Sequence, residues 1–463
     1  MNIMLTKEYI RDLKINGNGS FEKLVLSNYS NAGNLVFILE NLGHLPSNFS
    51  AGWLIELTKS KYPKVRELAI KNIGKLTHEK YIQILKDFAL NEKDTNVRRE
   101  AVSAIGRMRL PENKSILFEL LEDADPKIVC QVIRGLLIFK GREEIDKRLK
   151  SLINHENEIV RTVIYKEYFA NSKSNANILP HSETYKYLKN VVVNADVREV
   201  LRIIPEESIH LTFTSPPYYN ARDYSIYPSY DAYLKFLEDV FLETYRVTKE
   251  GRFLIVNTSP IIIPRISRAH SSKRYPIPFD LHHYLVQMGW EFIDDIVWMK
   301  PEYSVKNRIG GFQQHRKPLA YKPNSITEYL MVYRKSTEKL LDWNMRQYDN
   351  KVINESKVSD GFETTNVWKI DPKFDKIHSA VFPYELCKRV VEYYSFKNDI
   401  VFDPFGGSGT LGRTAKSLGR YFFLTEQEPK YFEYMKTFMQ KDIIIDEKKT
   451  KFLTYEQFKE TIV

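Results

Sequence analysis

Apolar residues recur at helical spacing in four similar segments of the N-terminal part of the chain. The segments are PKVRELAIKNIGKL from Pro63, TNVRREAVSAIGRM from Thr95, PKIVCQVIRGLLIF from Pro126 and NEIVRTVIYKEYF from Asn157. Their starting positions are almost evenly spaced, and each segment has the apolar stripe that covers one face of a helix. A helix striped in this way cannot bury its apolar face alone, so the pattern predicts stacked helical units.

Further helical segments, EKYIQILKDFAL and NKSILFELLED, lie between these copies. A helix pair repeated at this spacing resembles the HEAT repeat, the unit of a helix-pair solenoid. The resemblance covers roughly residues 50–170, and an irregular helical bundle is the alternative. Because residues 1–50 are expected to be helical packing or a cap, we predict an all-α HEAT-like domain over residues 1–170.

The pattern changes after the polar stretch NSKSNANILPHSE, residues 171–183, which we interpret as a linker. From residue 184 to the C-terminus, short β-rich runs alternate with helical stretches. The runs include SIHLTFTS, GRFLIVNT, WEFIDDIVWM and GRYFFLTE, and SYDAYLKFLEDVFLETYRVT is a helical stretch between two of them. This alternation predicts an α/β domain with a mostly parallel sheet over residues 184–463.

A glycine-rich turn follows one predicted strand in the sequence IVFDPFGGSGT. Ligands of α/β sheets bind beyond the carboxyl ends of strands, and glycines there let the backbone approach a ligand closely. No Lys-Ser or Lys-Thr pair follows the turn, which argues against a phosphate-binding P-loop. Asp403 ends this strand and Glu426 ends the next one, where a carboxylate can accept hydrogen bonds from ribose hydroxyls.

Two prolines follow another predicted strand, in the sequence TSPPYY that begins at Thr214. Neither Pro216 nor Pro217 has a backbone N–H, so this strand tip presents acceptors without competing donors. The motif TSPPYY followed far downstream by DPFGGSGT resembles the amino-group DNA methyltransferases that use S-adenosylmethionine. The order of the two motifs, catalytic first and cofactor last, is that of their β class. The resemblance covers roughly residues 185–440.

Further motifs carry the same resemblance. HSAVFPYELCKRVV resembles the motif that packs on the methionine part of the cofactor, and VWMKP, with Trp298 and Lys300, also matches. TEQEPKYFEYM resembles the family's E-x-N-P-x-Y, although Glu428 stands where Asn is usual. The resemblance implies a Rossmann-like methyltransferase sheet preceded by the HEAT-like solenoid. It also implies a site for S-adenosylmethionine formed by Asp196, His378, Phe382, Pro383, Asp403, Phe405, Gly406, Gly407, Gly409 and Glu426.

The TSPPYY motif suits methylation of an exocyclic amino group. The lone pair of such a nitrogen is delocalised into the base, so the nitrogen is a poor nucleophile. The Ser215 hydroxyl and the Pro216 carbonyl can accept hydrogen bonds from the amino group and localise this lone pair. Tyr218 offers a flat face to a base that has been extruded from the duplex. We therefore predict that the catalytic residues are Ser215, Pro216, Pro217 and Tyr218.

The residue before the prolines helps to choose the base. In the resembled family, Ser here usually accompanies cytosine N4 methylation, while Asp or Asn accompanies adenine. A carboxylate accepts the amino hydrogen more strongly than a hydroxyl, yet either group can serve either base. We predict a cytosine-N4 enzyme and keep adenine N6 as the alternative. Ser215 is a poor general base, and nothing in the sequence places the nearby Asp223 or Asp231 as the proton acceptor.

Two basic stretches are candidates for contact with DNA. One lies between Ile261 and Tyr275 and has no acidic residue; the other follows Lys300 and contains a glycine pair. Such loops suit phosphate contacts and base reading in a groove, although a solvated charged face is the alternative for each. The predicted DNA-binding residues are Arg265, Arg268, Lys273, Arg274, Lys306, Arg308, Arg316 and Lys317, with a target-recognition insertion over about residues 300–368.

Composition agrees with this class of partner. A formal charge of +10 and a pI of about 9.1 favour an anionic partner, here double-stranded DNA. The two cysteines, Cys130 and Cys387, lie far apart without neighbouring histidines, which argues against a zinc site or a disulfide framework and favours a reducing cytoplasm. We find neither a signal peptide nor an apolar run of about 18 residues, so we expect no membrane association.

The leading hypothesis is a site-specific DNA methyltransferase of a restriction–modification system, paired in function with a restriction endonuclease. RNA or protein methylation is a second enzyme class. A non-enzymatic alternative is a solenoid scaffold with an inactive methyltransferase domain, against which the intact TSPPY and DPFGGSGT motifs and Glu426 argue. The oligomeric state and the recognition sequence are left open.

Overall fold

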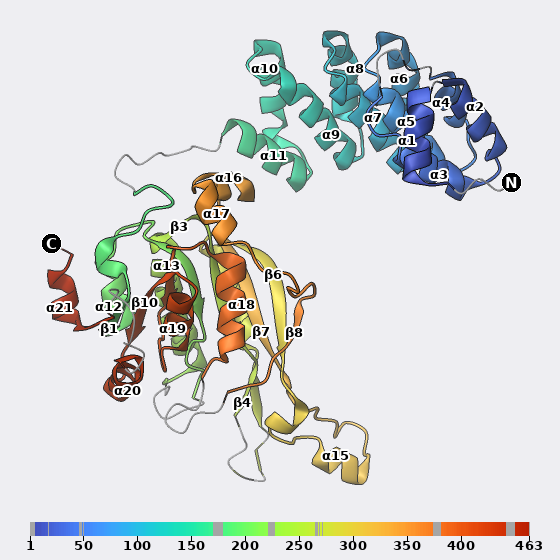
Figure 1. Cartoon of the computed structure of the whole chain (residues 1–463). Coiled ribbons are helices and arrows are strands. Elements are labelled where there is room, and N and C mark those ends of the chain that lie inside the picture. Colours follow the sequence, from blue (N-terminus) through green and yellow to red (C-terminus); the bar gives the residue numbers. More distant parts are fainter. Residues whose placement is uncertain are drawn as a thin grey trace. The chain divides into compact units, whose positions relative to one another are not determined.

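The chain folds into two compact units, Met1–Lys173 and Ser174–Val463 (Figure 1). This computed structural model describes residues 5–16, 18–45, 49, 51–169, 179–220, 227–263, 267, 269–270, 272–373, 381–440 and 450–462. No helix in these ranges is both long and apolar enough to cross a membrane.

The first unit is helical throughout its described residues. Its first helices are α1 (Lys7–Asn16), α2 (Asn18–Ser27), α3 (Ala32–Glu40) and α4 (Gly52–Leu57). The four repeated segments form α5 (Pro63–Lys75), α7 (Thr95–Arg107), α9 (Pro126–Leu136) and α11 (Glu158–Tyr168). Between them lie α6 (Ile82–Asn91), α8 (Lys114–Glu119) and α10 (Glu143–Ser151). The predicted all-α repeat architecture is confirmed.

Local chemistry explains why the repeats begin and pack where they do. The carboxylate of Asp94 caps α7 and that of Asp125 caps α9, each accepting backbone N–H groups of the first turn. A Cβ placed on Gly74 would lie 2.6 Å from the Cβ of Ala104, so α5 and α7 are in closer contact than a larger residue allows. The apolar stripes that define the repeats form one continuous core.

The second unit is built on a nine-stranded sheet with the order β11-β1-β10-β9-β2-β3-β7-β6-β8. All neighbouring strands are parallel except at β7, which is antiparallel to both β3 and β6. Most strands are buried on both faces. The strands are β1 (Val191–Asn194), β2 (Ile209–Thr214), β3 (Thr248–Thr258), β6 (Trp290–Met299), β7 (Thr327–Lys335), β8 (Val367–Lys369), β9 (Ile400–Asp403), β10 (Tyr421–Glu426) and β11 (Lys451–Thr454), and β4 (Ile261–Ile263) pairs with β5 (Lys273–Tyr275) in a separate hairpin.

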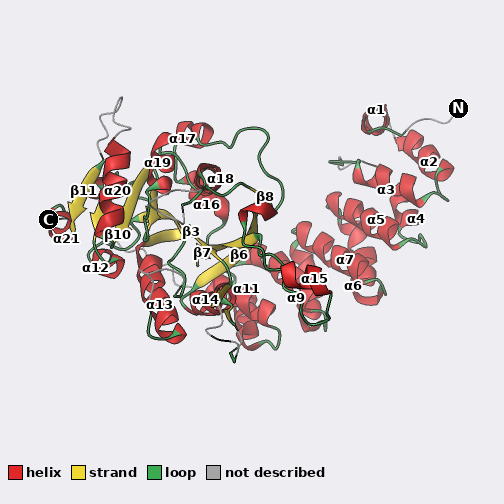
Figure 2. Cartoon of the chain, turned by 90° about the horizontal axis from the view of Figure 1, so that it is seen from below, coloured by secondary structure: helices red, strands yellow, loops and turns green. Residues whose placement is uncertain are grey.

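Helices cover both faces of this sheet, as Figure 2 shows for α13 and α14 on one side and α18 and α19 on the other. The first face carries α12 (Val197–Arg202), α13 (Tyr230–Val247), α14 (Ile277–Gln287) and α21 (Tyr455–Glu460). The second carries α18 (Tyr384–Tyr394), α19 (Thr410–Ser417) and α20 (Pro429–Gln440). The predicted α/β fold class is confirmed.

The strand order creates a topological switch point between β9 and β2. From β9 the chain crosses through α19 to β10 on one side, and from β2 it crosses through α13 to β3 on the other. Ligands of α/β sheets bind in the crevice beyond the carboxyl ends of the strands at such a point. The glycine-rich turn follows β9 and the proline motif follows β2, so both meet at this crevice.

Residues 300–368 do not form one insertion, which corrects the predicted target-recognition segment. They include β7, which is hydrogen-bonded between β3 and β6 inside the sheet. Residues 300–326, with α15 (Gly310–His315), connect β6 and β7 at the carboxyl end of the sheet. The helices α16 (Leu341–Arg346) and α17 (Asn350–Glu355) follow β7 and lie at the amino end instead. Only residues 300–326, which we call the β6–β7 arm, leave the sheet on the side of the crevice.

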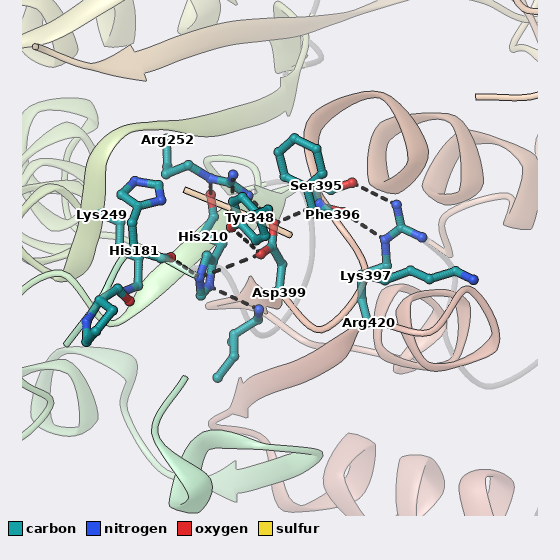
Figure 3. Close-up of polar contacts among 12 residues, drawn as sticks. His181, His210, Lys249, Arg252, Tyr348, Ser395, Phe396, Lys397, Asp399 and Arg420 are labelled. Atoms are coloured by element: carbon teal, nitrogen blue, oxygen red, sulfur yellow. Dashed lines mark hydrogen bonds and ion pairs between the residues drawn. The ribbon is translucent and has the colours of Figure 1, made fainter. Parts of the chain in front are cut away.

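A buried polar cluster fixes the amino end of the sheet, where the parallel strands begin (Figure 3). Asp399 accepts hydrogen bonds from Tyr348 Oη at 2.6 Å and from the backbone of Phe396 at 2.8 Å, and it is ion-paired with Arg252. His210 accepts a hydrogen bond from Ile400 N and donates one from Nε2 to the carbonyl of His181. We call His210, Arg252, Tyr348 and Asp399 the amino-end cluster.

The same region holds the end of the stretch that we interpreted as a linker. Lys249 Nζ donates to the carbonyl of Pro180 at 3.1 Å, and His181 Nε2 donates to the carbonyl of Glu250 at 3.0 Å. Residues 179–183 are therefore anchored on the α/β unit, while residues 170–178 lie outside the described ranges.

Candidate active site at the carboxyl end of the sheet

A cavity of about 430 Å³ lies at the switch point, bordered by both motifs. The proline motif contributes Ser215, Pro216, Pro217 and Tyr218 to its wall. The glycine turn and the end of β10 contribute Asp403, Phe405, Gly406, Gly407 and Glu426. Segments that lie far apart in the sequence therefore form one site.

A direct hydrogen bond ties the two motifs together. Thr214, the last residue of β2, donates from Oγ1 to Asp403 Oδ1 at 2.7 Å. Asp403, the last residue of β9, also accepts the backbone N–H of Phe405 at 3.0 Å. These contacts fix the start of the proline motif relative to the start of the glycine turn.

The glycine turn is held by Glu426. One carboxylate oxygen accepts the backbone N–H of Gly407 at 2.8 Å and the other accepts that of Glu428 at 2.9 Å. Gly407 and Gly409 have φ of +53° and +72°, a left-handed conformation that L side chains rarely adopt. A Cβ on Gly409 would also lie 2.7 Å from Met435 Cγ, so this glycine permits packing of α20 and is not part of the cavity wall.

Two carboxylates of the cavity, Asp403 and Glu426, lack cationic partners among the described residues. Neither Asp403 nor Glu426 forms an ion pair with a described Lys or Arg side chain, and both are at least nine-tenths buried. Burial raises the pKa of Asp403 to about 7, and it also raises the pKa of Glu426. The cavity therefore has a net preference for a positively charged ligand.

Tyr218 joins the proline motif to two other strand ends. Its hydroxyl donates to Glu328 Oε2 at 3.2 Å and lies beside the hydroxyls of Ser215 and Ser259. Glu328, near the start of β7, is ion-paired with Lys300, which follows β6. Burial and the Glu328 charge raise the pKa of the Tyr218 phenol, so it stays protonated at neutral pH.

The remaining cofactor residues from the prediction are placed differently from one another. Phe382 lines the cavity and stacks on Phe213 with ring centroids 4.6 Å apart. Pro383 precedes α18 outside the cavity wall. Asp196 caps α12 and pairs with Arg198 at 2.6 Å, so its carboxylate is already engaged. His378 lies outside the described residues.

The described parts of the two predicted basic stretches lie at the carboxyl end of the sheet. Burial and then the charge of Arg274, on β5, lower the pKa of Arg308, on the β6–β7 arm. Both segments follow the carboxyl ends of strands, and Figure 1 shows β4 and α15 projecting from the same end of the sheet. The described members of the predicted DNA-binding set are Lys273, Arg274, Lys306, Arg308, Arg316 and Lys317, while Arg265 and Arg268 lie outside the described residues.

Sequence reasoning missed several residues of the site. It noted Lys300 only as part of a motif, and it gave no role to Glu328, Ser259 or Asn257, although Lys300, Glu328 and Asn257 line the cavity. One signal was available for Glu328, which is a charged residue at the start of an otherwise apolar strand, TEYLMVY.

Comparison with known proteins agrees with this geometry. Residues 209–437 match the DNA methylase family, and residues 50–136 and 89–167 match HEAT repeats. The Type II methyltransferase M.Cfr9I of Citrobacter freundii is 29% identical over 288 residues, which are 55% of this chain and 89% of the relative. The Type II beta methyltransferase M.BslI of Bacillus sp. is 27% identical over 253 residues, which are 52% of this chain. The chain spans about a quarter, 26%, of the length of that relative.

Among solved structures, a putative DNA modification methylase from Thermus thermophilus is similar to part of this chain. The alignment has 25% identity and a TM-score of 0.46, and it covers 57% of this chain and 99% of the other. Both motifs and most of the residues that line the cavity lie inside the segment that matches the methylases, and the lining residues Ala195 and Val197 precede it. Residues 209–437 are therefore related in sequence to DNA methylases of the amino-group type, and residues 50–167 are related to HEAT repeats.

Proposed function

We propose that the protein is an S-adenosylmethionine-dependent DNA methyltransferase that modifies the N4 amino group of cytosine in double-stranded DNA. The observation that carries the proposal is one cavity bordered by both the Ser215–Tyr218 strand tip and the glycine turn with Glu426. The DNA methylase match and the Type II methyltransferases among the relatives support a DNA-modifying class. On the same basis we propose a restriction–modification setting, in which an endonuclease cuts the unmethylated sequence.

The residues of the cavity fit S-adenosylmethionine. Each oxygen of Glu426 accepts one backbone N–H, so each retains a lone pair for a ribose hydroxyl. The uncompensated carboxylate of Asp403 suits a ligand that carries a sulfonium and an ammonium group. When bound, this cofactor supplies an electrophilic methyl group on sulfur.

The strand tip would prepare the amino group for attack. Ser215 Oγ and the carbonyl of Pro216 accept its two N–H groups and localise the nitrogen lone pair. Pro216 and Pro217 contribute no donor to compete with these contacts. Acceptors that are already in position at such a site typically change rates by about 100-fold or more per hydrogen bond. Ser215 in place of a carboxylate or amide is the reason for proposing cytosine rather than adenine.

The β6–β7 arm suits contact with duplex DNA beside the cavity. Residues 303–326 contain Lys306, Arg308, Arg316, Lys317 and Lys322 and no acidic residue. The arm also exposes Tyr303 and Leu319, and Phe312 packs edge-on against Tyr321 at 5.2 Å. Basic side chains on a projecting loop provide phosphate contacts that fix the enzyme on the duplex.

The test is to incubate the full chain with labelled S-adenosylmethionine and unmethylated duplex DNA of mixed sequence, followed by mass spectrometry of the nucleosides. We expect N4-methylcytosine. N6-methyladenine would overturn the choice of base and keep the class of enzyme. Label found only in RNA or protein substrates, or in none, would overturn the proposed function.

The Ser215→Ala variant tests the assigned role of the strand tip. We expect the single-turnover rate to fall by about 100-fold with nearly unchanged affinity for cofactor and DNA, because the lost contact forms mainly in the transition state. Ser417→Ala, on α19 and outside the cavity wall, is the matched control. A Ser215→Ala enzyme that turns over at the wild-type rate would contradict the assignment.

A further inference from the structure

Four strand ends converge on the hydroxyl of Tyr218. Ser215 follows β2, Ser259 follows β3, Glu328 lies near the start of β7, and Lys300 follows β6. The Tyr218 hydroxyl donates to Glu328 and lies beside the hydroxyls of Ser215 and Ser259, and Glu328 is ion-paired with Lys300. A ring that serves only as a stacking surface needs none of these contacts, so the network has a purpose that stacking does not explain.

The donors and acceptors in this network have a fixed direction. Glu328, as the carboxylate of an ion pair, can only accept, so Tyr218 donates its one hydrogen to Glu328 Oε2. The oxygen of Tyr218 can then only accept from the neighbouring hydroxyls of Ser215 and Ser259. A hydrogen bond from Ser215 to this oxygen uses the one hydroxyl hydrogen of Ser215 and leaves its lone pairs for a group in the cavity.

The network matters because the hydroxyl of Ser215 alone has no fixed hydrogen-bond direction. A serine hydroxyl can donate or accept, whereas an amino group that is to be activated needs an acceptor. Both side chains of the ion pair are less than one-fifth exposed, so water competes little with the arrangement. Lys300 also lies 4.5 Å from the centre of the Trp298 ring, which keeps it beside Glu328.

We propose that Glu328 is a positioning residue that acts through Tyr218 to hold Ser215 as a hydrogen-bond acceptor and then takes up the proton that leaves the methylated amino group. The inference rests on the proposed function and names the proton's destination at the same site. It also gives the hydroxyl of Tyr218 a role. A phenylalanine would suffice for stacking but has no hydroxyl to perform this role.

The proposed reaction balances in electrons and protons. The amino nitrogen forms a bond to the methyl carbon as the bond from that carbon to sulfur breaks, and sulfur keeps the electron pair. The nitrogen then carries one excess proton. This proton passes to Ser215 Oγ while the proton of Ser215 passes to Tyr218 and that of Tyr218 passes to Glu328. A neutral methylated amine and a neutral carboxylic acid result, and Glu328 later returns the proton to water.

The experiment measures single-turnover methylation of unmethylated duplex DNA by the full chain and by Glu328→Gln, Tyr218→Phe and the double variant. We expect each single variant to be about 100-fold slower, the usual scale for a lost preorganised hydrogen bond or a lost proton acceptor. Dissociation constants for S-adenosylmethionine and DNA should stay within about threefold, and the double variant should be no slower than the slower single variant, because both break one chain.

Glu291→Gln is the control, since Glu291 lies on the same β6–β7 hairpin and its ion pair with Arg334 is outside the cavity. A Glu328→Gln enzyme at the wild-type rate, additive losses in the double variant, or weakened cofactor binding in both single variants would overturn the inference alone. If Glu328→Gln does not fold, Tyr218→Phe decides by the same criteria. A wild-type chain that transfers no methyl group to DNA would overturn the proposed function and the inference with it.

Discussion

The two ends of β9 hold buried carboxylates in opposite environments. Asp399, just before the strand, is ion-paired with Arg252 and accepts hydrogen bonds from Tyr348 and the backbone of Phe396. Asp403, at the other end of the strand, accepts hydrogen bonds from Thr214 and a backbone N–H but has no cationic partner among the described residues. One strand thus connects a compensated charge with an uncompensated one.

The difference corresponds to the surroundings of the two carboxylates. At the amino end, the cluster is closed, and its cation and hydrogen-bond donors are all supplied by the chain. At the carboxyl end, the missing positive charge borders a cavity, where a ligand can supply it. A perturbed carboxylate beside a cavity is therefore a stronger indication of function than a buried ion pair, which is common in purely structural positions.

The amino-end cluster should be the more sensitive of the two to loss of charge. Asp399→Asn leaves the Arg252 guanidinium, which is 3% exposed, without its anion. We expect the free energy of unfolding to fall by about 3–5 kcal/mol, the usual cost of an unpaired buried charge. Denaturant unfolding followed by tryptophan fluorescence measures this, because four of the five tryptophans lie in the α/β unit.

Asp342→Asn is the control for that measurement. It removes a partner of Arg346 on α16 in an exposed pair, and such pairs contribute less than about 1 kcal/mol. Equal effects of the two substitutions would mean that the amino-end cluster does not stabilise the sheet as its contacts indicate.

Asp403, unlike Asp399, should destabilise the folded chain when it is charged. The free energy of unfolding should therefore depend on pH. In the folded chain its pKa is raised to about 7, above its ordinary value of 3.8. Between these values only the folded state holds the proton, so the free energy of unfolding decreases as pH rises and the loss is complete above about pH 7. The uncompensated charge costs about 4 kcal/mol at pH 8 by this linkage.

Asp403→Asn does not titrate and removes that cost. We expect the variant to gain stability relative to the wild type between pH 5 and pH 8, and to bind S-adenosylmethionine more weakly. Denaturant unfolding at both pH values, with calorimetry for the cofactor, checks both parts. A stability difference that is the same at pH 5 and pH 8 would show that Asp403 does not titrate in this range.

The carboxyl end was largely predictable from the sequence, and the amino end was not. Two short motifs, TSPPY and DPFGGSGT, stand at the carboxyl ends of β2 and β9. Each motif is one continuous stretch, so the conformation that its prolines or glycines favour can be inferred without knowing the rest of the fold. By contrast, the amino-end cluster unites His210, Arg252, Tyr348 and Asp399, which are widely separated in the sequence and belong to no repeated pattern. Their partners are fixed by the strand order, which could not be read from the sequence.

The unknown strand order also explains why residues 300–368 were grouped wrongly and why Glu328 was missed. Residues 300–368 were grouped as one insertion because basic and polar stretches surround β7, although its apolar run was itself visible as a strand. Glu328 lies 110 residues from Tyr218, and only the pairing of β7 with β3 brings them together. Asp196 was assigned to the cofactor site because of its position in the motif. The motif does not reveal that Asp196 caps α12 and pairs with Arg198.

Glu426, at the carboxyl end of the sheet, should affect cofactor binding. Glu426→Ala removes the acceptor for ribose hydroxyls and the support of Gly407 and Glu428, and we expect S-adenosylmethionine binding to weaken by about 1–3 kcal/mol. Calorimetry on the folded variant measures the change. Glu433→Gln, on the outer surface of α20, is the matched control and should bind like the wild type. Unchanged affinity in Glu426→Ala would remove Glu426 from the cofactor site.

Tyr348→Phe should give the smallest effect and separates the two ends of the sheet most cleanly. It deletes one hydroxyl that donates to Asp399 at 2.6 Å, while the ion pair with Arg252 and the Phe396 N–H remain. We expect the free energy of unfolding to fall by about 1.5 kcal/mol, as for a buried hydrogen bond to a charged acceptor. Tyr303→Phe, at a side chain that is 85% exposed on the β6–β7 arm, should change stability by less than about 0.5 kcal/mol.

Cofactor affinity is the decisive second measurement on Tyr348→Phe. The amino-end cluster contributes no residue to the cavity wall, so S-adenosylmethionine should bind with wild-type affinity even though the protein is less stable. If affinity falls together with stability, the two ends of β9 are coupled through the strand. The amino-end cluster would then support the ligand site as well as the fold, and the division of labour between Asp399 and Asp403 would be wrong.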